Sequence, residues 1–126
     1  MKFYSKLLSL LFFCFIILAN ASFSRELATW GFTGSKCSKT IDIINQFGKT
    51  GKSTLGFSIQ GFLTGYNSHV MMMDLQKKSS VKAKVINKYS ITEITNILIG
   101  KCTATPKKAT YVALIEIWRT FPDAVY

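Results

Sequence analysis

The sequence predicts a small all-α domain, and three observations support this prediction. Apolar residues recur at helical spacing in four separate stretches, glycine or proline stands at the ends of several of them, and an export segment precedes them all. Apolar residues repeated every three or four positions form one face of a helix. The chain is therefore expected to fold as four helices around one core.

The N-terminal stretch has the pattern of a secretory signal peptide over residues 1–21. Two lysines precede an apolar run at 7–18, and Ala19 and Ala21 are the small residues that a signal peptidase requires. The run is about a dozen residues long, short of the roughly 20 that a spanning helix needs. We expect cleavage after Ala21, a single helical domain over 22–126, and a periplasmic location, with secretion beyond the periplasm as the alternative.

The chain is strongly basic, with 16 lysine and arginine residues against 6 acidic ones and a net charge of +10. Such a charge can attract membrane phosphate, anionic glycans, nucleic acid or an acidic protein. The basic residues are scattered, apart from the Lys77–Lys88 segment, and do not alternate with aromatic residues on one face as nucleic-acid binding requires. We expect no nucleic-acid partner, no stable membrane insertion, and a largely solvated basic surface.

The cysteines predict one disulfide. Cys14 lies in the export segment, which leaves Cys37 and Cys102 as a pair in an oxidising compartment. Because the loop between them is long, chain entropy assigns the bridge about 4 kcal/mol of stabilisation. A metal site or a catalytic thiol is the alternative, but His69 is the only histidine and no second cysteine stands at ligand spacing to either cysteine. We expect no metal and no cofactor.

The central helix is expected over residues 54–75. Its apolar stripe consists of Leu55, Ile59, Phe62, Tyr66, Val70 and Met73. A second stripe is made of small residues, Ser58, Gly61, Gly65 and Ser68. Glycine inside a helix costs about 1 kcal/mol relative to alanine. We therefore expect a neighbouring helix backbone to lie against the small stripe.

A first helix is expected over residues 35–47, with Gly48 as its terminator. The following segment, GKTGKST, is similar to a phosphate-binding loop. That motif requires a glycine where this chain has Gln46, and it requires a preceding strand, whereas an amphipathic helix precedes here. We interpret residues 49–53 as a polar loop between two helices.

Two further helices follow a polar, lysine-rich connection. Ser90 and Glu93 form a capping box before an apolar stripe that ends at Cys102. Thr105 followed by proline predicts the start of the last helix, whose stripe runs to Trp118 and Phe121.

The residues that could perform catalysis do not assemble into a recognised constellation. The acidic residues after the export segment do not pair on one helix face, and His69 has no acidic neighbour within one turn on its N-terminal side. Glu116 faces away from its stripe and is expected in solvent. A hydrolase needs a nucleophile, a base and an orienting group together. We therefore expect a protein that is not an enzyme.

Three successive methionines indicate a contact surface. Met71, Met72 and Met73 cannot all face one way, so at least one should be exposed, although filling the core is the more ordinary use of methionine. Pliable methionine side chains suit adaptive protein contacts. The candidate partner surface consists of Tyr66, His69, Met71, Met72, Lys77 and Lys78.

A cleavable signal, an early cysteine, a late cysteine after the short helix ITNILIGKC, and a final helix ending in Trp118 occur together. In these features the mature chain resembles the small exported bacterial proteins grouped around the HdeA/HdeB acid-stress chaperones. The resemblance implies a four- to five-helix orthogonal bundle with one disulfide, carried here by Cys37 and Cys102. It also implies a homodimer that acid loosens to expose apolar faces to unfolding clients. The chain departs from that scheme because it has few carboxylates to titrate.

The segment GFLTGYN is similar to the glycine-bearing helix of Tai-type periplasmic immunity proteins, which neutralise type VI secretion toxins. This second resemblance implies a dimer that offers a fixed surface to one toxin, through residues 66–73 or the 77–88 loop. An envelope or secreted protein of another role is a third class. Acid behaviour separates them, since a chaperone is converted by low pH and an inhibitor need not be.

Overall fold

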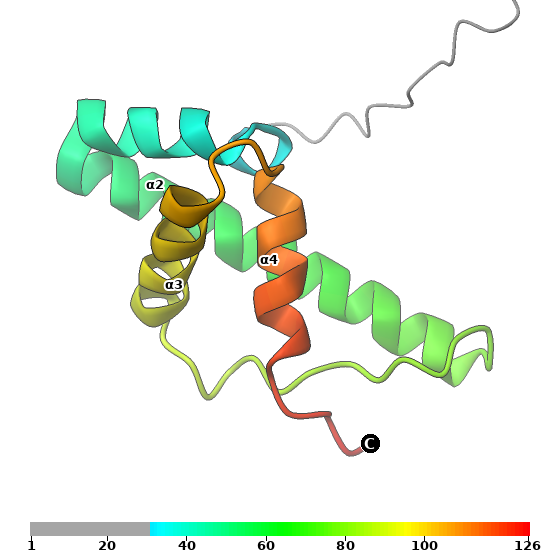
Figure 1. Cartoon of the computed structure of the whole chain (residues 1–126). Coiled ribbons are helices and arrows are strands. Elements are labelled where there is room, and N and C mark those ends of the chain that lie inside the picture. Colours follow the sequence, from blue (N-terminus) through cyan, green and yellow to red (C-terminus); the bar gives the residue numbers. More distant parts are fainter. Residues whose placement is uncertain (1–30) are drawn as a thin grey trace, which may run out of the picture.

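The computed structural model of the chain describes residues 31–126, so the expected signal peptide and residues 22–30 lie outside the described part. Figure 1 shows α3 (Ile91–Ala104) and α4 (Thr110–Arg119) running beside one another across one side of α2 (Cys37–Leu75), and both helices contact α2. The all-α class is confirmed, since the described residues form helices and no strand. The elements are η1 (Phe32–Gly34), α2 (Cys37–Leu75), α3 (Ile91–Ala104) and α4 (Thr110–Arg119).

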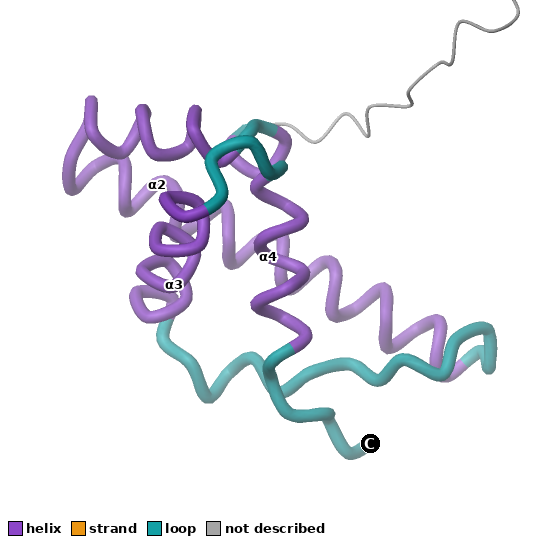
Figure 2. The backbone as a smooth tube through the Cα atoms, in the orientation of Figure 1, coloured by secondary structure: helices purple, strands orange, loops and turns teal. Residues whose placement is uncertain are grey.

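The expected count of four to five helices is not matched in the described part, which has three. The first two expected helices are two arms of α2, which reverses direction at Gly48 (Figure 2). Gly48 has φ 54° and ψ −124°, a backbone conformation that favours glycine. Because the helix resumes at once, the loop expected at 49–53 does not form. We call residues 37–47 the first arm and residues 49–75 the second arm.

Gly51 allows the two arms to pack closely just after the reversal. A Cβ atom at this position would lie 3.1 Å from the carbonyl oxygen of Ile43 and 3.2 Å from the Cα of Ile44. The GKTGKST segment therefore joins two packed helical arms. A phosphate-binding loop instead joins a strand to a helix.

The core forms where α3 and α4 cover the second arm. The expected stripe is buried at Leu55, Ile59 and Val70 and half-buried at Phe62, Tyr66 and Met73. The core also takes in Leu63, which the predicted stripe omitted, together with residues of α3 and α4. These are Ile94, Leu98, Cys102, Ala113, Leu114, Ile117 and Trp118.

The expectation for the small stripe is wrong. Gly61, Gly65 and Ser68 are exposed, and a Cβ atom at either glycine would meet nothing within 4 Å. The helix contact instead occurs at Gly56, where a Cβ atom would lie 3.6 Å from Thr95 Oγ1 in α3. The prediction failed because a row of small residues shows that another helix could pack against that side of α2, but it does not show that one does.

A disulfide between Cys37 and Cys102 joins the start of α2 to the end of α3, as expected, and both cysteines are fully buried. Beside it, the hydroxyls of Thr40 and Thr110 form a buried hydrogen bond of 2.9 Å. These contacts tie α2, α3 and α4 together at one end of the molecule, which we call the disulfide end.

The expected helix start at Thr105 is wrong, because α4 begins at Thr110. The Thr105 hydroxyl donates to the Lys101 carbonyl and so belongs to the end of α3. The turn that follows caps the start of α2. Its Pro106 and Lys108 carbonyls accept hydrogen bonds of 2.9 and 2.8 Å from the first amides of α2, which lacks a capping side chain.

The capping box of α3 is present as expected. Ser90 Oγ accepts from the Glu93 amide at 3.2 Å, and the Ser90 amide donates to Glu93 Oε2 at 2.8 Å. The hydrogen bonds from the Ser90 hydroxyl and amide lower the pKa of Glu93. The capping box thereby fixes the residue at which α3 starts.

Candidate protein-binding surface

Five of the six predicted partner residues gather at the outer end of α2. His69, Met71 and Met72 are exposed on the last turns of the second arm, and Lys77 and Lys78 are exposed directly after the helix. The structure thus brings apolar and basic side chains together at this end.

Tyr66, the sixth residue, lies on another side of the helix. It is half-buried, and its ring meets the Trp118 ring edge-on with the centroids 4.9 Å apart. Tyr66 therefore serves the packing of α4 on α2. Its place in the apolar stripe was the signal for this role.

Two exposed apolar residues that the sequence reasoning missed complete the surface. Leu75 is 64% exposed at the end of α2, and Val81 is 49% exposed in the connection that follows. The helical spacing of Leu75 from Met71 and Met72 could have identified the first of them. We call the surface formed by Met71, Met72, Leu75, Lys77, Lys78 and Val81 the tip.

The tip is fixed by the way α2 ends. The amides of Gln76, Lys77 and Lys78 donate to carbonyls of Met72, Asp74 and Met73, and Lys77 has a positive φ of 56° that turns the chain back. This turn directs the polypeptide from α2 into the connection over residues 76–90.

Asp74 fastens that connection and the chain end to α2. Its Oδ2 accepts from Lys82 Nζ at 2.7 Å and from the Tyr126 hydroxyl at 2.6 Å. Hydrogen bonding to Lys82 and then to Tyr126 lowers the Asp74 pKa. The carboxylate therefore stays ionised to lower pH than a free aspartate.

Asn67 is the most connected polar side chain near the tip. Its Oδ1 accepts from Trp118 Nε1 at 2.9 Å and from the Lys84 amide at 2.7 Å, and its Nδ2 donates to the Lys84 carbonyl at 3.0 Å. One side chain of α2 thus positions both α4 and the connection.

The C-terminal strap, residues 121–126, lies along the same connection. The Ala124 amide donates to the Ala83 carbonyl at 2.8 Å, and the Val85 amide donates to the Pro122 carbonyl at 2.9 Å. An ion pair between Lys84 and Asp123 accompanies these bonds. Asp74, Asn67 and the strap together hold the backbone from which Lys82 and Val81 project.

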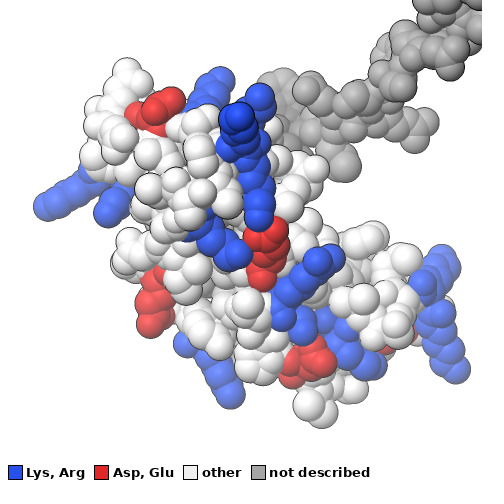
Figure 3. All heavy atoms as spheres, viewed as in Figure 1, with Lys and Arg blue, Asp and Glu red and all other residues white. Residues whose placement is uncertain are grey.

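Basic side chains lie within the tip and next to it. Lys77, Lys78 and Lys82 lie within or beside it, and only Lys82 forms an ion pair there, with Asp74. Figure 3 shows blue side chains scattered over the visible face, including the right-hand end of the view. The tip therefore combines exposed apolar area with positive charge.

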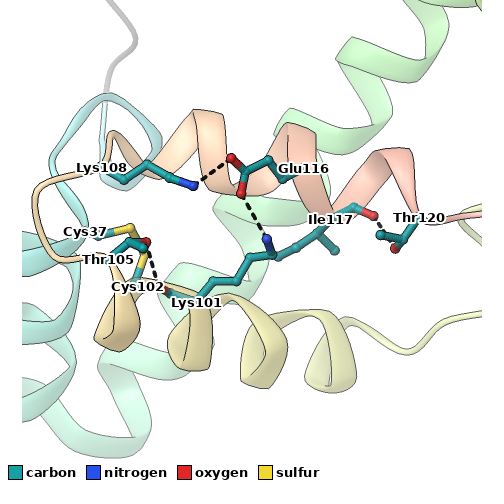
Figure 4. A network of polar contacts seen from close by, with 8 residues as sticks. All are labelled: Cys37, Lys101, Cys102, Thr105, Lys108, Glu116, Ile117 and Thr120. Atoms are coloured by element: carbon teal, nitrogen blue, oxygen red, sulfur yellow. Dashed lines mark hydrogen bonds and ion pairs between the residues drawn. A yellow bond between two sulfur atoms is a disulfide. The ribbon is translucent and has the colours of Figure 1, made fainter.

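A second polar network lies near the disulfide end and links α3 to α4. Glu116 accepts from Lys101 at 2.9 Å and from Lys108 at 2.6 Å (Figure 4). These hydrogen bonds, that of Lys108 first, lower the pKa of Glu116 to about 2. Glu116 was expected in solvent, and its side chain is 33% exposed because Lys101 and Lys108 converge on it.

Three hollows on the surface of the described part border α2. Two lie on either side of Ile91, between the second arm and α3, and one lies at the start of α2. Their linings contain no histidine, cysteine, aspartate or glutamate. Among residues 31–126 no group of three or more such side chains could hold a metal ion.

Comparison with protein-family models, with curated proteins and with solved structures found no match for this chain. Within the described residues, none of the helices has both the length and the apolar character needed to cross a bilayer. The geometry of the tip is therefore the main evidence for a function.

Proposed function

We propose that this chain is an exported protein, not an enzyme, that works by binding another protein through the tip. One observation carries the proposal: Met71, Met72, Leu75 and Val81 expose apolar surface beside Lys77 and Lys78. Exposed apolar patches rimmed by polar residues are typical of protein–protein contact sites. The expected partner presents an apolar patch bordered by acidic side chains.

The chemistry of the tip favours a protein over other partners of a basic chain. Unbranched methionine side chains adapt to irregular apolar surfaces. The lysines add attraction to acidic groups and speed the encounter. Nucleic-acid binding would instead require aromatic side chains among the lysines.

The first candidate form of this function is the HdeA-like acid-stress chaperone, which captures unfolding clients in the periplasm. The contact that supports it is that of Asp74 with Lys82 and Tyr126. Protonation of Asp74 in acid weakens the attachment of the strap and the connection, which favours exposure of the apolar side chains beneath, Ala83 and Phe121.

The second candidate form is the Tai-type immunity protein, which binds one toxin. The observation that favours it is that the tip is exposed while the carboxylate of Asp74 is ionised, so that no conversion is needed for binding. This form predicts a partner bound equally well at neutral pH.

The test compares the wild-type protein with two serine variants, one in the tip and one outside it. Leu75→Ser removes apolar surface from the tip, and Ile97→Ser is the matched control because Ile97 is a 47% exposed residue of α3. Aggregation of an unfolding client is followed at pH 7 and at about pH 2.

Suppression of aggregation only in acid, weakened by Leu75→Ser and not by Ile97→Ser, supports the chaperone form. A protein without effect on clients at either pH, but which captures one toxin-like partner at pH 7 through Leu75, supports the immunity form. Equal behaviour of Leu75→Ser, Ile97→Ser and wild type in both assays would rule out the tip as the binding surface.

Export is tested separately by the mass of the protein recovered from the periplasm. Cleavage after Ala21 predicts a mature chain that begins at Ser22. A full-length chain retained in the membrane fraction would contradict this part of the proposal.

A further inference from the structure

The methionines of this chain, apart from Met1, all lie in one short segment. Met71, Met72 and Met73 follow one another near the end of α2, and no other methionine occurs in the sequence. Cleavage of the expected signal peptide removes Met1. Chemistry that acts on methionine therefore acts on the mature protein at the tip or directly beside it.

The three methionines differ in how far their side chains are open to solvent. Met72 is 55% exposed and Met71 is 38% exposed, whereas Met73 is half-buried. The two exposed side chains belong to the tip, and Met73 does not. A solute that reacts with thioethers therefore reaches the tip first.

The cysteine sulfur atoms of the described part are closed to such a solute. Cys37 and Cys102 are joined in the disulfide, and both are fully buried. A cysteine thiolate is the usual target of mild oxidants, and a buried disulfide supplies none. Within residues 31–126 the sulfur atoms most open to an oxidant are therefore those of Met71 and Met72.

We propose that Met71 and Met72 are oxidation sites, and that a peroxide makes the tip polar by converting their thioethers to sulfoxides. The sulfur attacks one oxygen of hydrogen peroxide, and the O–O bond breaks as the S–O bond forms. The second oxygen leaves as water with both protons. Sulfur gives up an electron pair and the peroxide is reduced, so that a polar side chain replaces an apolar one.

This modification changes the feature that carries the proposed function, and its effect on binding rests on that function. The partner is expected to contact Met71 and Met72 together with the other apolar residues of the tip. A sulfoxide oxygen buried against an apolar patch loses its hydrogen bonds to water, which a thioether does not. Oxidation of both sites is therefore expected to weaken binding at least about tenfold.

Oxidation at the tip is expected to leave the fold intact. Among residues 31–126, neither the buried core nor the half-buried residues packed against it include a methionine. The carbonyls of Met72 and Met73 accept hydrogen bonds at the end of α2, and these join backbone atoms that the reaction does not touch. A loss of binding after oxidation can therefore be separated from unfolding.

The test treats the purified, disulfide-bonded protein with hydrogen peroxide at neutral pH. Fragmentation mass spectrometry locates each added oxygen, native hydrophobic-interaction chromatography measures exposed apolar surface, and urea unfolding measures stability.

Two variants separate the exposed methionines from the half-buried one. A double variant, Met71→Leu with Met72→Leu, removes both exposed thioethers. Met73→Leu is the matched control, because it makes the same change one residue further along α2. Leucine nearly keeps the volume of methionine and has no sulfur. Each protein is compared only with its own untreated sample.

In the wild type and in Met73→Leu, we expect oxygen to appear at Met72 first and at Met71 next. Both treated proteins should elute earlier from the column with an unchanged urea midpoint, while the double variant should elute as before treatment. Oxidation that begins at Met73, unchanged elution of the treated wild type, or an equal shift in the double variant would overturn the proposal. So would a lower urea midpoint, because the change would then be one of folding.

The client and partner-capture assays of the proposed function are then repeated with treated protein. Treatment should weaken binding at least about tenfold in the wild type and in Met73→Leu, and should not change it in the double variant. Binding that peroxide leaves unchanged in the wild type would overturn this control of the tip. If the untreated protein binds neither clients nor a partner, the proposed function fails, while oxygen mapping and chromatography still decide whether the tip is the oxidation site.

Discussion

Different kinds of contact hold the helices together at the two ends of the molecule. At the disulfide end, a covalent bond and the Thr40–Thr110 hydroxyl pair are fully buried. At the opposite end, which we call the strap end, Asn67, Asp74 and the C-terminal strap are held by hydrogen bonds and ion pairs that are partly open to solvent.

This difference implies that the ends differ in local stability and in their response to conditions. Buried bonds without titratable groups are insensitive to pH and salt, whereas exposed ion pairs are screened and titrate. Regions with few buried contacts open at lower free energy than the rest of a protein. The strap end, which borders the tip, is therefore the part expected to open first.

The largest effect is expected from the covalent bond at the disulfide end. Replacing both Cys37 and Cys102 by serine should lower the free energy of unfolding by about 4 kcal/mol, because the bridge closes a loop with a sequence separation of 65. Urea unfolding measures this loss. Chemical reduction of the wild type serves as the control and should reproduce it; an unchanged urea midpoint in both would contradict the assigned role.

A smaller loss is expected at the strap end from Asn67→Leu. The change leaves Trp118 Nε1 and the Lys84 amide without their acceptor and should cost about 2 kcal/mol. Thr40→Val at the disulfide end is the comparison variant, and it should cost about 1 kcal/mol because it removes the hydroxyl that contacts Thr110 at 2.9 Å and Ser35 at 3.1 Å. Urea midpoints that rank these two variants in reverse order would show that Asn67 is not the main polar anchor.

Local signals in the sequence predicted much of the fold. The spacing of neighbouring residues predicted the stripe at Leu55 and Ile59 and the capping box at Ser90. The number of cysteines after the export segment predicted the disulfide. The sequence predicted that the first helix ends at Gly48. It did not predict that the chain reverses there without a loop, because this depends on the packing of Gly51 against the first arm.

The rest depended on partners distant in sequence. The turn after Thr105 was taken for a helix start because the amides of α2 that it caps lie about 70 residues earlier. At the candidate site, exposure of Met71 and Met72 was predictable from three successive methionines, but Asn67 was missed. Its only local signal is a polar side chain beside an apolar stripe, and its role requires Trp118 and Lys84.

Acid is expected to loosen the contacts of the strap end and to leave those of the disulfide end intact. The Asp74 pKa lies below its ordinary value of 3.8, so the stabilisation by its contacts is complete above that value and is lost as the pH falls through the lower folded pKa. In hydrogen exchange corrected for intrinsic rates, the Val85 and Ala124 amides should lose protection below about pH 4, while the Cys37 amide stays protected.

Asp74→Asn is the control for this titration, since it removes the charge at every pH. It should reduce the protection of Ala124 at pH 7 and flatten the acid response. Loss of protection at the Cys37 and Ala124 amides in parallel would mean that the ends do not differ. Glu116 has a pKa lowered to about 2, so the contribution of its own network to stability is complete above its ordinary value of 4.5 and is lost as the pH falls through about 2.

The smallest effect is expected from Tyr126→Phe, which removes only the hydroxyl that donates to Asp74. Tyr126 is 53% exposed, so the melting temperature should fall by roughly 2 °C or less. The hydrogen bond to Asp74 raises the Tyr126 pKa above 10.0, so this contact is present below that pH and is lost as the pH rises through the folded pKa.

The contact also weakens when Asp74 is protonated. The difference in melting temperature between wild type and Tyr126→Phe should therefore be greatest between about pH 5 and about pH 9 and shrink on both sides. In an Asp74→Asn background the same change should have almost no effect, since the charged acceptor is already gone. A difference that is constant with pH would mean that the hydrogen bond from Tyr126 to Asp74 does not respond to the charge of Asp74, and that this contact is not an acid-sensitive fastening of the strap.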